Sequence, residues 1–366
     1  MERRAWLQGL WKIVKEVFLQ KILTWHLPSS GLLLPDQFSG HSVIVTGATS
    51  GIGYHTARGL AMSGAHVIMA CRNTKAAKEI ADRWQEEAQG SRALHVEVTC
   101  AGSERSVMEL DLLSLASVRS FAADWERRNQ PLHVLINNAG VYLMGEPQKF
   151  SLDGIEQHMQ VNHVAPALLT LLLLPSLLRA PFARIVNVNS VAHHCAVVNA
   201  QNWKRRMEEK KFSSIQAYGA SKRAHLMFLK VLDSKLQEQG KNCIQCIAVH
   251  PGIVATNLFR VISKDRSGGS IRRKVGARSV LFCVASVDVG ANLAKGFAYY
   301  SCNCKPAPVA AQAADMDSCL EVWKKTLEIS GLDLDFLTQL VKMANATQTP
   351  TLFCRGILLG NASVVV

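Results

Sequence analysis

The chain has 366 residues, of which 48% are hydrophobic and 19% are charged. This balance excludes an intrinsically disordered protein and leaves room for one large domain with a full hydrophobic core. The formal net charge of +13 at pH 7 often accompanies a partner that carries phosphate groups, such as a nucleic acid, an anionic lipid or a phosphorylated cofactor.

The pattern of residues 1–38 predicts an N-terminal amphipathic helix followed by a linker. Charged residues interrupt its apolar pattern too often for a membrane-spanning segment, and no signal peptide is apparent. Two alternatives remain open: peripheral contact with a membrane, or docking on the chain's own domain or on a partner. The apolar positions recur every three or four residues: Leu7, Trp11, Val14, Phe18, Ile22 and Trp25.

Residues 39–335 form one predicted domain in which strand-like and helix-like segments alternate, and residues 336–366 are expected to be a C-terminal tail. The alternation predicts an α/β protein with a parallel sheet and helices on both of its faces. The leucine-rich segment 164–178 predicts one helix, buried either in the core or at the interface of a homodimer. The predicted strands are 42–46, 66–70, 107–110, 133–137, 184–189 and 244–249, and the predicted helices before the third strand are 57–63 and 74–87.

A glycine-rich loop follows the first predicted strand and opens a helix. This is the context in which glycines let the backbone approach a dinucleotide pyrophosphate and present helix N-terminal amides to it. The residues assigned to the cofactor here are Thr46, Gly47, Ser50, Gly51, Ile52 and Gly53.

The second predicted strand ends at Ala70-Cys71-Arg72, with no acidic residue to hold the ribose hydroxyls. Arg72 is instead suited to a 2′-phosphate, which predicts NADP(H) as the cofactor. Asp111 and Leu112, at the end of the third predicted strand, are expected to face the adenine.

Small and amide residues, Asn138, Ala139 and Gly140, follow the fourth strand and are expected to line the cofactor crevice. Tyr218 and Lys222 are four residues apart, so both side chains leave the same face of a helix. A nearby ammonium stabilises a phenolate, so we expect Lys222 to lower the pKa of Tyr218.

After the sixth strand, Pro251 and Gly252 predict a turn whose backbone passes over the nicotinamide, and Thr256 is expected to bond the carboxamide. We expect the neighbouring His250 to pack at the end of the strand and not to act as a catalyst.

The basic clusters at 204–211 and 264–278 do not alternate with aromatic residues, so we expect solvated loops and no nucleic-acid partner. The ten cysteines are scattered along the chain. In a chain of this size they favour a reducing, cytoplasmic compartment over a disulfide framework. Cys243 and Cys246 have a metal-like spacing but no second ligand pair, so no metal is predicted.

In their order along the chain, these motifs resemble the short-chain dehydrogenase/reductase family over about residues 40–330. Within that family the chain is similar to the branch of retinol dehydrogenases and WW-domain oxidoreductases, and in it to the plant forever young group. The segments with this closer likeness are Ala70-Cys71-Arg72-Asn73, residues 131–140, residues 160–167 and Val322-Trp323-Lys324-Lys325-Thr326.

The resemblance implies a Rossmann fold with a doubly wound, seven-stranded parallel sheet. It also implies a catalytic tetrad: Asn162, Ser190, Tyr218 and Lys222. Tyr218 would exchange a proton with the substrate oxygen while Ser190 holds that oxygen. Lys222 would bind the nicotinamide ribose, and Asn162 would position a water in the proton relay.

Two features depart from the family pattern. An insertion, 193–216, separates Ser190 from Tyr218 and is longer than in the smallest members, and a basic segment, 264–274, stands where relatives have an apolar substrate lid. The first hypothesis, based on the tetrad and the cofactor motifs, is an NADP(H)-dependent oxidoreductase for a lipophilic carbonyl or alcohol, located in the cytoplasm or peripherally on a membrane facing the cytosol. The alternative is a catalytically silent NADP-binding scaffold with the same fold.

Overall fold

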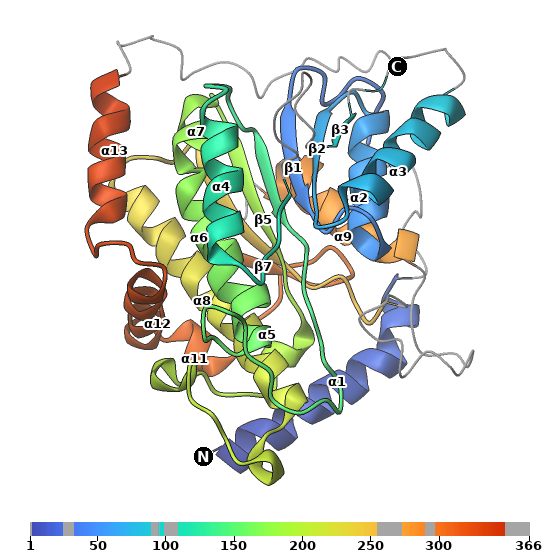
Figure 1. Cartoon of the computed structure of the whole chain (residues 1–366). Coiled ribbons are helices and arrows are strands. Elements are labelled where there is room, and N and C mark those ends of the chain that lie inside the picture. Colours follow the sequence, from blue (N-terminus) through green and yellow to red (C-terminus); the bar gives the residue numbers. More distant parts are fainter. Residues whose placement is uncertain are drawn as a thin grey trace.

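Seven parallel strands form a single sheet in the order β3-β2-β1-β4-β5-β6-β7, as the seven-stranded prediction requires (Figure 1). The computed structural model describes residues 2–24, 33–88, 94, 96–98, 109–254, 273–289 and 297–347. The strands are β1 (Ser42–Thr46), β2 (His66–Ala70), β3 (Val96–Val98), β4 (Val134–Asn137), β5 (Ala183–Val188), β6 (Ile244–Val249) and β7 (Ala298–Tyr300).

Helices cover both faces of this sheet, which makes it the doubly wound Rossmann fold that the resemblance implies. The helices before β5 are α1 (Glu2–Thr24), α2 (Gly51–Met62), α3 (Thr74–Glu87), α4 (Leu115–Glu126), α5 (Gln157–Met159), the π-helical turn η1 (Gln160–Val164), α6 (Ala165–Leu172) and α7 (Leu174–Arg179). Those after β5 are η2 (Val191–His194), η3 (Ala200–Asn202), η4 (Glu209–Lys211), α8 (Ser214–Glu238), α9 (Arg273–Ala285), α11 (Ala311–Ala314), α12 (Met316–Ile329) and α13 (Phe336–Thr347).

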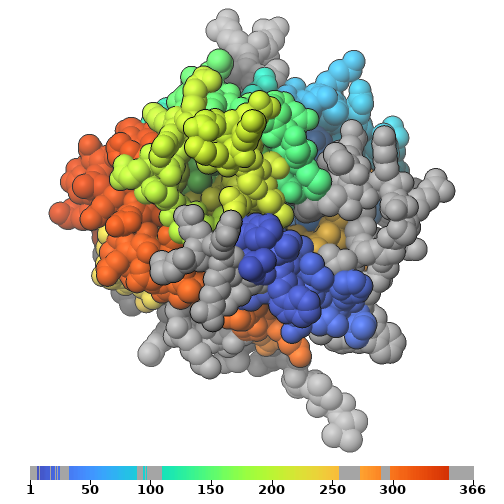
Figure 2. Space-filling view, turned by 90° about the horizontal axis from the view of Figure 1, so that it is seen from below, coloured from blue at the N-terminus to red at the C-terminus, as the bar shows by residue number. Residues whose placement is uncertain are grey.

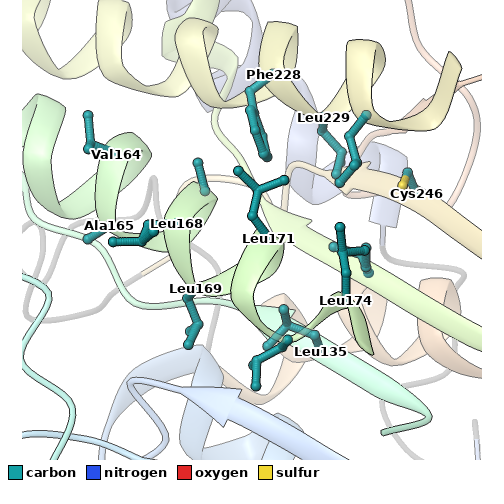
Figure 3. Packing of buried hydrophobic residues seen from close by; sticks show 14 of the residues in the cluster. Leu135, Val164, Ala165, Leu168, Leu169, Leu171, Leu174, Phe228, Leu229 and Cys246 are labelled. Carbon is teal, nitrogen blue, oxygen red and sulfur yellow. The ribbon is translucent and has the colours of Figure 1, made fainter. Parts of the chain in front are cut away.

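The two faces of the sheet bury two separate hydrophobic clusters. Successive side chains of a strand point to opposite faces, so Ile44 joins one cluster while Val43 and Val45 join the other. The larger cluster contains residues of α4, α6, α8 and α12, and the smaller one contains residues of α2, α3 and α9. In the larger cluster, Phe228 of α8 points toward Leu171 of α6 (Figure 3).

Most predicted strand and helix bounds agree with the structure to within a residue, but the third strand is elsewhere. β3 is Val96–Val98 and pairs with β2, whereas Glu109 to Asp111 lie outside any strand. Leu110 donates a single backbone hydrogen bond to Cys71, at 3.2 Å, so this segment runs beside the end of β2 without forming a ladder. The prediction of a strand at 107–110 was therefore wrong for its described residues.

The leucine-rich segment forms two helices, α6 and α7, where the sequence predicted one. Leu173 separates them, with φ −90° and ψ −1°. Pro175 has no N–H to donate to residue 171, and its ring crowds that carbonyl, so a continuous helix is disfavoured there. Both helices belong to the larger core cluster, so this segment is part of the domain's own core.

The two ends of the described chain also pack on the domain. Leu337 and Val341 of α13 are buried in the larger cluster, so a packed helix begins the segment predicted as a C-terminal tail. At the other end, α1 lies across the bottom of the molecule in Figure 1 and contacts η2. The structure therefore shows α1 docked on its own domain, as in one of the two alternatives that the sequence left open.

Candidate functional site

The predicted dinucleotide loop lies between β1 and α2, in the strand-turn-helix arrangement that its sequence required. Ser50 is the N-cap of α2 but makes no side-chain capping bond, so its hydroxyl does not occupy the first amides of the helix. A Cβ on Gly53 would lie 2.4 Å from both Asn138 Nδ2 and the Gly47 carbonyl oxygen. Only glycine allows this close approach of α2 to the end of β4.

Thr46 ties the end of β1 to the end of β4. Its hydroxyl accepts hydrogen bonds from the backbone amides of Asn138 and Ala139, each at 3.0 Å. The Asn138 side chain donates in return to the Thr46 carbonyl at 2.9 Å. The carboxyl ends of the two central strands are thereby held together, where open α/β sheets bind ligands.

A cavity of about 510 Å³ opens at this edge of the sheet, within the size range of cofactor sites. Asn162 and Gly53 do not line this cavity, although both lie next to residues that do. Thr256 lies outside the described residues. The other predicted site residues all line this cavity: Thr46, Gly47, Ser50, Gly51, Ile52, Arg72, Asp111, Leu112, Asn138, Ala139, Gly140, Ser190, Tyr218, Lys222, Pro251 and Gly252.

Tyr218 and Lys222 lie on the same face of α8, as their spacing predicted, and both are buried. Lys222 Nζ donates to the Val188 carbonyl at the end of β5, at 2.9 Å. The same nitrogen lies 6.0 Å from the centre of the Tyr218 ring. The phenol also has a side-chain hydrogen bond with Ser190.

The pKa values in this site differ from the expectation that Lys222 lowers that of Tyr218. Burial raises the pKa of Tyr218 to about 12, against an opposing effect of the bond with Ser190 and with a further increase from Tyr142. Burial also lowers the pKa of Lys222 to about 8. Since desolvation disfavours the charged form of each group, the phenol is neutral at pH 7 in this structure.

Asn162 bridges the loop after β4 and α8. Its Oδ1 accepts the Val141 amide at 2.8 Å, and its Nδ2 donates to the Val141 carbonyl and to Ser221 Oγ, each at 2.9 Å. It lies in the π-helical turn η1, a feature often found at functional sites. Asn162 therefore fixes the loop that follows Gly140, although Asn162 itself does not line the cavity.

Sequence reasoning missed Tyr142. Its ring stacks on that of Tyr218, with centroids 4.7 Å apart and planes at 25°. The one sequence feature that could have pointed to Tyr142 is its position, two residues after Gly140 at the predicted crevice. His158 lies at the edge of both rings, accepts the Leu143 amide at 3.0 Å and contacts Glu156 at 2.6 Å. The Tyr218 phenol is thus enclosed by side chains of the loop after β4 and of α5.

His250 packs at the end of β6, as predicted, and is buried. Its Nδ1 accepts the Val191 amide at 3.3 Å, and its Nε2 lies 3.5 Å from Glu16 Oε1. The contact with α1 could not be anticipated from sequence, because more than two hundred residues separate the two groups.

The cysteines and the Cys243–Cys246 pair can be placed where the structure describes them. Every cysteine in the described residues is a free thiol, and Cys246 is buried in β6. Among those same residues, no cluster of three or more histidine, cysteine or acidic side chains could hold a metal ion.

Comparison with known proteins identifies the family. The model of the short chain dehydrogenase family matches residues 41–203 and 206–267. The chain is 41% identical over 355 residues to the dehydrogenase/reductase SDR family member FEY of Arabidopsis thaliana, covering 93% of this chain and 91% of that protein. It is 34% identical over 302 residues to retinol dehydrogenase 12 of Homo sapiens, covering 81% and 88%.

A crystal structure of an uncharacterised protein from Mycobacterium Paratuberculosis is similar over 82% of this chain and 96% of that one, with a TM-score of 0.62 and 31% identity. The family model, the relatives in sequence and the solved structure point to the same family. The chain belongs to the short-chain dehydrogenase/reductase family, whose members are oxidoreductases that use NAD or NADP.

Proposed function

We propose that this protein is an NADP(H)-dependent oxidoreductase that transfers hydride to or from a lipophilic carbonyl compound or alcohol. The observation that supports this most directly is the convergence of Ser190, Tyr218 and Lys222 on the cavity beside the glycine loop. A scaffold that only binds nucleotide has no physical need for all three groups at this edge.

Tyr218 is protonated at pH 7, which allows a role as proton donor. A neutral phenol at pH 7 can protonate the oxygen of a carbonyl substrate, while Ser190 donates a hydrogen bond to the same oxygen. When bound, the reduced nicotinamide supplies the hydride for the carbonyl carbon. The carbonyl then becomes an alcohol, and the phenolate left on Tyr218 regains a proton from solvent. This chemistry supports the reductive direction.

Arg72 supports NADP(H) over NAD(H). It follows β2, lines the cavity and is exposed, and no acidic residue stands at the end of β2 to bind ribose hydroxyls. An exposed guanidinium loses little hydration when it forms a bidentate contact with a phosphate.

A second cavity, of about 190 Å³, supports a lipophilic substrate. Ala217 and Gln216, directly before Tyr218, form part of its wall, and Cys195 lies close enough to Tyr142 to raise the pKa of that phenol, after burial itself. Most of the other lining side chains are apolar or aromatic: Trp6, Met159, Ala196, Val197, Trp203, Met207, Phe212 and Ala220.

This apolar wall comes mainly from the insertion 193–216, with Trp6 of α1 and residues of α5 and α8 completing it. The basic segment 264–274, which stood in place of a lid in the sequence, is described only at Arg273 and Lys274, where α9 begins. We infer that the insertion provides the apolar surface for the substrate, next to the reacting phenol.

We further propose that α1 contacts a membrane peripherally. No helix in the described part of the chain is long and apolar enough to cross one. The outward face of α1, however, exposes a stripe of large apolar side chains (Trp11 is 68% exposed and Phe18 74%) next to Lys15. Such a face can insert at the boundary of headgroups and acyl chains, with Lys15 near anionic lipids.

The first prediction concerns the reacting phenol. Tyr218→Phe should keep the NADPH dissociation constant but lower carbonyl reduction by about 10²- to 10⁴-fold, because the proton donor is lost while the ring remains. Turnover is followed by the absorbance of the reduced nicotinamide over a panel of aldehydes and ketones. Tyr300→Phe, on β7 outside the cavity, is the matched control and should keep its turnover. A parent protein that binds NADPH and reduces nothing in the panel would support the scaffold alternative.

The second prediction concerns cofactor choice. Arg72→Asp should weaken NADPH binding by roughly 10- to 100-fold, the value of one lost charge-assisted contact, and should leave NADH binding equal or stronger. Arg83→Asp, on the exposed side of α3, makes the same charge change away from the cavity and should affect neither cofactor. Equal losses for both cofactors in Arg72→Asp would remove Arg72 from the phosphate site.

The third prediction concerns the apolar cavity. Ala220→Leu should fill it and lower kcat/KM for decanal by about tenfold or more, since burying each methylene contributes about 0.8 kcal/mol. The kcat/KM for propanal, which is too short to reach the cavity from Tyr218, should stay at the parental value. Ala311→Leu, exposed on α11, adds the same volume elsewhere. A uniform decrease for both aldehydes would contradict this assignment.

The fourth prediction concerns the outward face of α1. The double variant Trp11→Glu and Phe18→Glu should lose at least about tenfold in binding to vesicles of phosphatidylcholine and phosphatidylserine, because burying each aromatic ring contributes about 1.5–3 kcal/mol. Sedimentation with the vesicles measures this. Leu152→Glu, a fully exposed leucine outside the stripe, should bind like the parent. A parent protein that does not sediment would end the proposal.

A further inference from the structure

Polar side chains of α1 contact the domain, while several of its large apolar side chains are exposed. Lys12, Glu16 and Gln20, spaced by four residues, all contact the domain. Trp11 and Phe18 are among the most exposed large apolar side chains of the described chain. In Figure 2, α1 appears in blue across the face seen from below, next to the yellow-green insertion. Ordinary surface helices have the opposite polarity, so the inward polar contacts need an explanation.

Gln20 binds both backbone groups of Ile253. The Ile253 amide donates to Gln20 Oε1 at 2.7 Å, and Gln20 Nε2 lies 3.4 Å from the Ile253 carbonyl oxygen. The Gln20 side chain is fully buried. Ile253 directly follows Pro251 and Gly252, and Gly252 has a φ of +85°. The helix therefore holds the loop after β6 by its main chain, immediately beside the cavity.

Glu16 reaches the same loop and its neighbour. Its carboxylate lies 3.5 Å from His250 Nε2 and accepts a hydrogen bond from Cys302 Sγ at 3.0 Å. Although burial opposes it, these contacts hold the pKa of Glu16 below its usual value, so the group is a carboxylate at neutral pH. On its other side, His250 accepts the amide of Val191, the residue after Ser190. Glu16 is thus two contacts away from the proposed substrate-binding hydroxyl.

Gly9 brings the backbone of α1 directly onto η2. A Cβ at Gly9 would lie 2.5 Å from the His194 carbonyl oxygen and 2.6 Å from Cys195 Cα. Lys12 contacts the His194 ring at 3.2 Å. Because a side chain at residue 9 has no room, the helix has one register in which Glu16 and Gln20 meet His250 and Ile253.

We propose that α1 positions the two loops at the nicotinamide end of the crevice, with Gln20 and Glu16 as positioning residues. The inference rests on the proposed function, because it assigns these loops to the nicotinamide. The Pro251-Gly252-Ile253 main chain is held before cofactor arrives, so less conformational entropy is lost on binding. The His250 contact holds the residue next to Ser190 in the same way.

A purely structural role for α1 is the main alternative, and Gln20→Leu separates the two. Leu keeps the volume of the side chain but loses both bonds to Ile253. We expect faster hydrogen–deuterium exchange in the peptide that contains Ile253, a rise of about tenfold in the NADPH dissociation constant, and a lower kcat/KM for decanal. Gln20→Glu keeps the acceptor for the Ile253 amide and should restore part of each effect. Gln130→Leu, exposed before β4, is the matched control and should match the parent.

The measurements also distinguish this inference from the proposed function. Exchange at Ile253 requires neither cofactor nor turnover, so an inert protein with faster exchange and weaker NADPH binding would support the positioning role while refuting the oxidoreductase. If Gln20→Leu lowers only the melting temperature, and leaves Ile253 exchange, NADPH binding and kcat/KM at parental values, then α1 is structural and the inference is overturned.

Discussion

A reciprocal pair of hydrogen bonds between the end of β5 and α8 holds the site together. Lys222 Nζ donates to the Val188 carbonyl at 2.9 Å, and the Asn189 side chain donates to the Lys222 carbonyl at 2.9 Å. Both bonds are buried, where an unmet polar group is costly. They place the face of α8 that carries Tyr218 against the strand that leads into Ser190, so the position of Tyr218 depends on the sheet and not on a surface loop.

The same burial sets the chemistry of the site. Taking Tyr218 and Lys222 out of water moves their pKa values in opposite directions, to about 12 and about 8, and favours the neutral form of each. A neutral phenol is a donor, which suits reduction. The spacing of the two residues predicts a lowered tyrosine pKa, because it reflects their mutual interaction. It does not reflect their desolvation, which no local pattern reveals.

The sequence predicted the fold where the signal was local. β-branched runs such as residues 42–46 and 244–249 gave the strands, and glycines between a strand and a helix gave the dinucleotide loop. The prediction from sequence failed where contacts between distant segments determine the structure. The strand at 96–98 forms because it pairs with β2, and Tyr142 matters because it stacks on Tyr218. The orientation of α1 was likewise hidden, since its periodicity shows two faces without showing which one meets the domain.

The contact of α1 with the loop after β6 has a thermodynamic corollary. If the docked helix favours the loop conformation that accepts a dinucleotide, then linkage requires the dinucleotide to favour the docked helix by the same free energy. The cellular concentration of the cofactor would then help to set the fraction of molecules in which α1 is docked on the domain. Occupancy of the crevice by dinucleotide would in this way be transmitted to the amino-terminal surface, far from the proposed site of reaction.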